Sequence, residues 1–180
     1  MRTGWIGRWL GAAAFTAIVA SPAHAQLTPP ANPADVESID GIVNAVYEVI
    51  SGAAGEQRNW GRFLSLFAPD ARLVPSGSSN GFNNYQVWTP REYMQQVGPQ
   101  LTQGGFFERE IHRVTERFGH VVHLFSTYES RGKADDAEPF TRGINSFQLL
   151  HDGTRWWVLS IYWTSERPDL PIPSTYLPSM

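Results

Sequence analysis

Two extended runs meet at a tight turn in the segment 141–164, which reads TRGINSFQLLHDGTRWWVLSIYWT. The turn contains Asp152-Gly153, and Asp-Gly between alternating apolar runs is about the strongest short-range signal for a β-hairpin. Both runs carry apolar side chains on both faces, whereas a hairpin with one face in water is polar on that face. The segment therefore predicts a sheet that is covered on both sides. Helices are the expected cover on one side, and a second subunit is the candidate for the other.

The register of this hairpin follows from counting outward from its turn. Leu149 is then predicted to lie opposite Trp156, and the remaining pairs follow residue by residue. This register puts Asn145 and Tyr162 together on the expected core side, because residues two apart along a strand share a face.

The rest of the chain supplies helices first and strands last. The spacing of apolar residues predicts three helices, over residues 36–50, 60–67 and 89–104. Between and after them it predicts a short strand at 71–75, a surface loop at 76–84, and long strands at 107–118 and 121–131. This order predicts an α+β domain. Its strongly curved, mixed, mainly antiparallel sheet is expected to wrap around the three helices and to enclose a cone-shaped cavity.

Both ends of the chain are set apart from this domain, which is predicted to span residues 35–166. Residues 1–25 have the basic start, the apolar run and the Ala-His-Ala ending of a secretory signal peptide. A membrane anchor is the alternative, but the apolar run is shorter than the ~20 residues that span a bilayer. Residues 26–34 are predicted as an extended leader and 167–180 as a proline-rich tail. Cleavage after Ala25 would place the mature protein in the periplasm or outside the cell.

Composition excludes several kinds of partner and site. The chain carries 14 basic against 17 acidic residues, and removal of the signal peptide takes away two of the arginines. Nucleic acid and, after cleavage, a membrane surface are therefore not expected as partners. The chain has no cysteine, which excludes disulfides, thiolate nucleophiles and cysteine-containing metal sites.

Three stretches of the chain resemble the nuclear transport factor 2-like superfamily, in its SnoaL-like branch of small secreted bacterial proteins. They are residues 60–71 (WGRFLSLFAPDA), residues 118–130 (FGHVVHLFSTYES) and residues 142–158. The resemblance spans about residues 36–166. It implies a curved sheet, three helices, a pocket between them and a homodimer formed through the outer face of the sheet. It does not imply one activity, because the fold hosts isomerases, dehydratases, epoxide hydrolases, cyclases and binding proteins without catalysis.

The resemblance also implies an aspartate at the bottom of the pocket, and this sequence departs from that pattern. All seven of its aspartates fall in predicted caps, turns, loops or the first helix, at positions 35, 40, 70, 135, 136, 152 and 169. Catalysis must then come from other side chains. The absence of a strand aspartate favours a binding protein.

The candidate catalytic residues lie on two neighbouring predicted strands. Glu108, Glu110 and His112 are two residues apart, so they are predicted to share one face. His112 would act as the acid or base and Glu110 or Glu129 would orient it. The alternative is a solvated stripe, since Glu and Arg alternate along this strand. A register slip of one residue would also disperse the group.

A metal site has weaker support. His112, His123 and a glutamate are suitable ligand types, but no closely spaced pair of histidines accompanies them. No metal and no cofactor are predicted.

The candidate ligand-binding residues are polar or aromatic side chains at the expected cavity. They are Tyr128, Asn145, Tyr162, Arg142 and Trp60. A few convergent polar groups in an apolar cavity are what a small-molecule site requires. The alternative for Tyr162 and Asn145 is hydrogen bonding within the core, and Arg142 opposite Trp163 reads as a structural cation–π pair.

Together these features predict an exported domain that binds a small apolar or aromatic molecule. One alternative is a cofactor-independent lyase, isomerase or hydrolase that uses general acid–base chemistry. The other is a non-catalytic accessory module that binds a protein partner.

Overall fold

The structure is a computed structural model that describes residues 29–79 and 81–179. The predicted signal peptide and the first residues of the leader lie outside the described residues, so cleavage after Ala25 remains a prediction. Within the described ranges, no helix combines the length and the apolar character needed to cross a bilayer.

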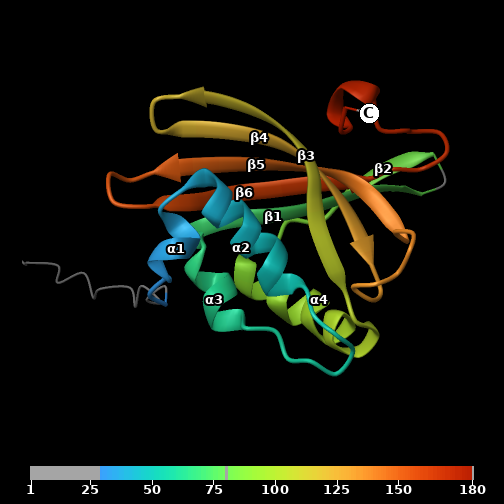
Figure 1. Cartoon of the computed structure of the whole chain (residues 1–180), viewed down its shortest axis with the longest axis horizontal. Helices are drawn as coiled ribbons and strands as arrows, with labels where there is room; N and C mark the ends of the chain where they lie inside the picture. Colours follow the sequence, from blue (N-terminus) through green and yellow to red (C-terminus); the bar gives the residue numbers. More distant parts are fainter. Residues whose placement is uncertain (1–28, 80, 180) are drawn as a thin grey trace, which may run out of the picture.

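Six strands form one sheet in the order β2-β1-β6-β5-β4-β3. They are β1 (Phe67–Ser79), β2 (Phe82–Tyr85), β3 (Phe107–Phe118), β4 (Val121–Arg131), β5 (Thr141–His151) and β6 (Trp156–Ser165). β1 runs parallel to β6, and the other neighbouring pairs are antiparallel. The sheet curves over the helices, which gather on one of its faces (Figure 1). The predicted α+β class, with a curved, mixed, mainly antiparallel sheet, is confirmed.

The helices are α1 (Pro33–Val36), α2 (Ile39–Ile50), α3 (Trp60–Ser65) and α4 (Pro90–Gly104), and a 3-10 turn, η1 (Ser174–Tyr176), lies in the tail. The first predicted helix is divided in two, because the Ser38 side chain accepts a 2.9 Å hydrogen bond from the N–H of Gly41 and caps a new helix there. Helix α4 begins with a capping box, in which Thr89 and Glu92 bond to each other's backbone N–H groups. The apolar stripes of these helices pack on the inner face of the sheet, where Phe147 and Val158 have no exposed surface.

The first strand is longer than the sequence pattern predicts. Phe67, expected at the end of the second helix, instead starts β1 and pairs with Val158 of β6. The end of β1 pairs with β2, so a hairpin replaces the loop expected at residues 76–84. Local spacing predicted only residues 71–75 of this strand, because the parallel partner of β1 lies about ninety residues away in the sequence.

A β-bulge changes the register between β5 and β6. Leu149 pairs with Val158 and not with Trp156. Between Leu149 and Gln148 the register shifts by one residue, so that Gln148 pairs with Ser160. Since one extra residue reverses which side chains face the core, Trp163 now lies opposite Asn145 on the inner face. Tyr162 lies opposite Ser146, on the outer face. The predicted register and the predicted pairing of Arg142 with Trp163 are therefore wrong.

A second bulge, at Ile111, interrupts the pairing of β3 with β4. Glu110 lies opposite Tyr128, whereas His112 lies opposite Thr127. Glu110 and His112 are thus on opposite faces of the sheet, and the predicted shared face is wrong.

The outer face is partly covered by the chain's own tail (Figure 1). Arg142 donates to Glu166 over 2.9 Å, the Thr127 hydroxyl donates to the Tyr176 carbonyl over 2.5 Å, and the Phe125 and Tyr176 rings lie 4.9 Å apart. Prolines keep the tail from forming a regular strand. The hairpin sequence predicts a cover over the outer face of the sheet, and the tail supplies part of this cover.

Candidate functional site

An apolar cavity of about 270 Å³ lies between the inner face of the sheet and helices α2 and α4. Most of its wall is aromatic or aliphatic, with the rings of Trp88, Tyr93 and Trp163 among its lining. Four side chains with hydroxyl, carboxyl or amide groups also line it: Tyr93 from α4, Glu108 from β3, Tyr128 from β4 and Asn145 from β5. An apolar cavity with a few convergent polar groups has the composition of a small-molecule site, and its volume suits a small ligand.

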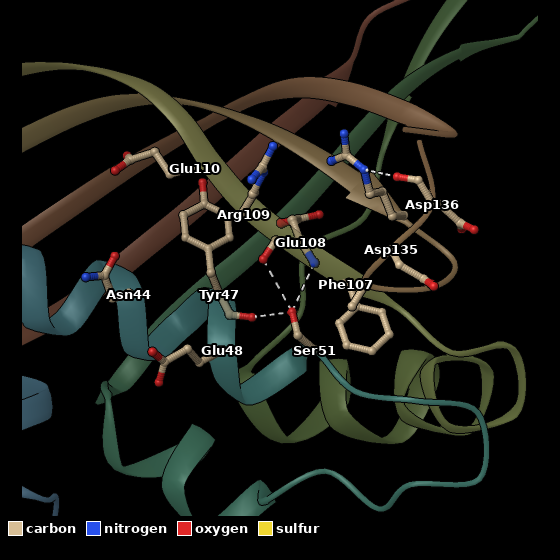
Figure 2. A pocket seen from close by; sticks show the side chains of 12 residues that line it. Asn44, Tyr47, Glu48, Ser51, Phe107, Glu108, Arg109, Glu110, Asp135 and Asp136 are labelled. Carbon is tan, nitrogen blue, oxygen red and sulfur yellow. Dashed lines mark hydrogen bonds between the residues drawn. The ribbon is translucent and has the colours of Figure 1, made fainter. Parts of the chain in front are cut away.

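The junction between α4 and β3 places Glu108. Gly105 follows the end of α4 with a φ of 71°, and a Cβ there would lie 2.8 Å from the carbonyl oxygen of Gly132. Glycine adopts this conformation at little cost. Three residues later the N–H of Glu108 donates to the Ser51 hydroxyl over 3.0 Å, and that hydroxyl donates to the Tyr47 carbonyl over 2.7 Å (Figure 2). The end of α2 thus holds the start of β3.

Glu108 also lines a second, more open pocket on the other side of this junction. That pocket, about 570 Å³, lies between the end of α2, the start of β3 and the loop after β4. Charged side chains from these segments surround it, among them Glu48, Arg109 and Asp135 (Figure 2). We call it the polar groove. Glu108 therefore belongs to the wall between an apolar cavity and a polar groove.

The environment of Glu108 favours its neutral form. Burial raises its pKa from 4.5 to about 7, although hydrogen bonds from Ser130 and Asn145 act in the opposite direction. The Ser130 hydroxyl donates to the carboxyl over 2.7 Å. Within the described part of the chain, no cationic side chain forms a salt bridge with Glu108. A carboxyl group that changes charge near neutral pH suits general acid–base chemistry.

Tyr128 owes its position to Gly143 on the neighbouring strand. A Cβ at Gly143 would lie 2.5 Å from the Tyr128 hydroxyl, so only glycine lets the phenol lie across β5. The hydroxyl hydrogen-bonds with the Ser165 hydroxyl over 3.1 Å. Burial raises the pKa of Tyr128 to about 12, so the phenol keeps its proton at neutral pH.

Asn145 ends a buried chain of hydrogen bonds that passes through helix α2. Its amide nitrogen donates to the Tyr47 hydroxyl over 3.0 Å, and Tyr47 lies 2.7 Å from the Ser126 hydroxyl. The Ser126 hydroxyl donates to Glu110 over 2.5 Å. Burial is the main cause that raises the pKa of Tyr47 far above its ordinary value. Every side chain in this chain of contacts is therefore a neutral donor until Glu110.

The predicted catalytic residues do not come together. His112 faces the side of the tail, while Glu110 faces inward and is bound by Arg113 through contacts of 2.6 to 3.0 Å. Glu129 is bound by Arg109 over 2.5 Å and by Arg131. Burial alone would raise the pKa of Glu129, but these two arginines lower it. The expected pair of His112 with Glu110 or Glu129 is not formed.

The predicted ligand-binding residues are divided between three places. Tyr128 and Asn145 line the inner cavity. Tyr162, which is 48% exposed, lines a pocket between the outer face and the tail. Arg142 is bound by Glu166, and the Trp60 ring packs edge-on against Phe63 with 5.4 Å between their centres, outside the cavity lining.

Two further residues of the site were not selected from the sequence. Glu108 was recognised only as a neighbour of Glu110, and its signal was its place just after the Gly104-Gly105 break, where a strand begins. Tyr47 sits among the apolar residues of α2 and gave no signal of its own. Within the described residues, no cluster of three or more His, Asp or Glu side chains is arranged to hold a metal ion.

Solved structures share this fold. A protein of unknown function with a cystatin-like fold from Nostoc punctiforme PCC 73102 aligns with a TM-score of 0.55 and 12% identity, over 74% of this chain and 91% of that chain. LinA aligns with a TM-score of 0.55 and 9% identity, over 80% and 93%. An uncharacterised protein with a cystatin-like fold from Caulobacter vibrioides aligns with a TM-score of 0.50 and 12% identity, over 74% and 90%. No protein-family model matches the sequence, and no curated protein matches it significantly. The chain thus has the cystatin-like, nuclear transport factor 2-like fold, and at these identities the likeness extends to the fold alone.

The raised pKa of Glu108 makes stability depend on pH. The folded state holds the Glu108 proton up to a pKa of about 7, whereas the unfolded chain releases it near 4.5. Stability is therefore highest below the lower value and falls as pH rises between the two. Between about pH 5 and pH 8 this costs the wild type about 2 kcal/mol in unfolding free energy, and Glu108→Gln should abolish the loss.

Denaturant unfolding at the two pH values measures this difference. Glu138→Gln, at an exposed glutamate, is the matched control and should behave as the wild type. Equal pH dependence in Glu108→Gln and the wild type would contradict the prediction.

Proposed function

We propose that this protein binds a small, largely apolar molecule in its inner cavity and that Glu108 transfers a proton to or from it. The observation that carries the proposal is the position of the Glu108 carboxyl, which lines an apolar cavity and forms no salt bridge within the described residues. Among the functions predicted from the sequence, this proposal corresponds to the acid–base alternative, with Glu108 in place of His112.

The chemistry follows from three of the polar groups of the cavity, those of Glu108, Tyr128 and Asn145. With a pKa of about 7, Glu108 exists in both protonation states near neutral pH and serves as base or acid. Tyr128 keeps its proton and offers a donor, and Asn145 offers an amide. Abstraction of a proton next to a carbonyl group, followed by its return elsewhere, needs these functions and no cofactor. The reaction class is an isomerisation or elimination on a small carbonyl compound.

Binding without turnover is the second candidate. The Tyr128 hydroxyl and the Asn145 amide are already bound within the protein, to Ser165 and Tyr47. Polar groups that already have hydrogen-bond partners in the protein are not left unpaired when an apolar ligand enters the cavity. This favours a carrier. The same outer face and tail would serve an accessory module that binds a protein.

A simple ketone tests both candidates. 2-Tetralone is small and largely apolar, and its carbons next to the carbonyl exchange hydrogen for deuterium when a base acts on them. In deuterated buffer the wild type should bind it and accelerate this exchange, measured by NMR. Glu108→Gln should still bind but lose about 100-fold in the exchange rate, the lower end of general-base contributions.

Two variants of α4 provide the controls for the cavity. Val97 lines it, so Val97→Trp should fill it and abolish binding. Gln95 is exposed on the same helix, and Gln95→Trp should change nothing. Exchange that persists in Glu108→Gln would overturn the proton transfer, and binding that persists in Val97→Trp would overturn the site. Binding without any exchange would leave the carrier.

We propose further that the protein is exported, as a member of the SnoaL-like branch, to the periplasm or the medium. The support is the signal-peptide pattern of residues 1–25. Mass spectrometry of the protein from its native host should find a mature N-terminus at Gln26. A chain that retains Met1 would contradict export by this route.

A homodimer through the outer sheet face is the proposed assembly. The support is apolar surface that the tail leaves open there, with Tyr162 48% and Val114 36% exposed. Light scattering at micromolar concentration should give about twice the mass of one mature chain. A single-chain mass across the concentration series would contradict the dimer.

A further inference from the structure

In the buried hydrogen bonds that connect Glu110 to Asn145, the donor and the acceptor of each bond are determined. This order of donors affects the surroundings of Glu108. We propose that Asn145 is a positioning residue for Glu108, and that Glu110 fixes which side of its amide faces the cavity. This inference rests on the proposed function, since it concerns the group that would transfer the proton.

The direction starts at Glu110. Arg113 donates to both of its carboxylate oxygens, over 2.6 to 3.0 Å, and also to Asp40 over 2.6 Å. A carboxylate only accepts hydrogen bonds. The Ser126 hydroxyl, 2.5 Å from Glu110, must therefore donate its one proton to that carboxylate.

Each following contact is then determined in turn. Ser126 has no second proton, so Tyr47 must donate to it over 2.7 Å. The Tyr47 oxygen is left to accept, so the Asn145 atom that lies 3.0 Å away must be its amide nitrogen. The side chain of an asparagine can otherwise be reversed with little change in shape. Here the reverse orientation would place two acceptors against each other.

Water cannot relax this arrangement. Tyr47, Ser126 and Asn145 have 4%, 0% and 6% of their surface exposed, and an unpaired polar atom at such a site costs about 1–3 kcal/mol. The orientation of Asn145 is therefore maintained from Glu110, although these two side chains do not touch.

The consequence falls on Glu108. Asn145 and Glu108 line the same cavity, and the Asn145 amide lowers the pKa of the Glu108 carboxyl against the larger effect of burial. The groups that face Glu108 are otherwise Tyr47 of α2, Tyr93 of α4, and Tyr128 and Ser130 of β4, with the polar-groove side chains Arg109, Arg131, Asp135 and Asp136 beyond them. If Asn145 turned round, its carbonyl oxygen would oppose the Glu108 anion.

Substitution of Ser126 interrupts the series of hydrogen bonds and tests the inference without replacing Glu108, Asn145, Glu110 or Arg113. Ser126→Ala frees the Tyr47 proton, which allows Asn145 to turn round. The carboxyl carbon of Glu108, followed by NMR in the ligand-free full chain and assigned with Glu108→Gln, should then titrate about one pH unit higher than in the wild type. Ser126→Thr keeps the hydroxyl and should restore the wild-type midpoint.

Three further variants separate this route from a general loss of structure. Tyr47→Phe leaves no proton at position 47 to donate to a turned Asn145, so in that background Ser126→Ala should no longer raise the midpoint. Ser146 is a buried serine beside Asn145 that contacts His123 over 3.0 Å on the outer face, and Ser146→Ala should leave the midpoint unchanged.

The outcomes distinguish this inference from the proposed function. A raised midpoint in the wild type that Ser126→Ala does not move would overturn the positioning role and leave the proposed function standing. A wild-type midpoint near 4.5 would overturn the proton transfer by Glu108, and this inference with it. Additive shifts in the double variant would also overturn the single chain of contacts.

Discussion

The site depends on a clamp between the end of helix α2 and the start of β3. Gly52 and Phe106 exchange backbone hydrogen bonds of 2.7 and 3.0 Å, and the Ser51 hydroxyl joins Tyr47 to Glu108 beside them. β3 is an edge strand, and an edge strand buries its side chains only where another element closes over it. Buried Arg58 completes the clamp by donating to carbonyl groups at the ends of both α2 and α4. Because the clamp closes the edge at this one place, the carboxyl of Glu108 is largely shielded from bulk water.

Burial of this carboxyl opposes stability above the pH at which the unfolded chain ionises. A leucine or methionine at position 108 would continue the apolar wall and carry no such cost. Structural roles do not require the glutamate, because β3 is already fixed by its backbone contacts with Ser51 and β4. Groups that oppose stability in this way concentrate at functional sites, and this is the physical reason to place the function at Glu108.

The sequence predicted the fold better than the site because the two depend on different information. The Asp-Gly turn, the Thr89 cap and the apolar spacing of α2 act over a few residues, so they could be recognised without a structure. The faces of the strands depend on register, and one bulge near Leu149 and another at Ile111 reverse them. These bulges moved Trp163 to the inner face and separated His112 from Glu110. Tyr128 and Asn145 were placed on the inner side correctly because β4 and β5 pair without interruption.

The inner face of β3 carries two carboxyl groups in contrasting surroundings. Glu110 is paired with Arg113 and sits at the end of a chain of donors, whereas Glu108, two residues earlier, has hydroxyl and amide neighbours and an apolar cavity beside it. Acid–base sites commonly divide their ionisable groups in this manner, with one held charged and the other free to change its proton. Glu108 also borders the polar groove, so it can exchange its proton with solvent while the cavity stays occupied. In the proposed function the charged group orients and the neutral one transfers the proton, and a single strand supplies both.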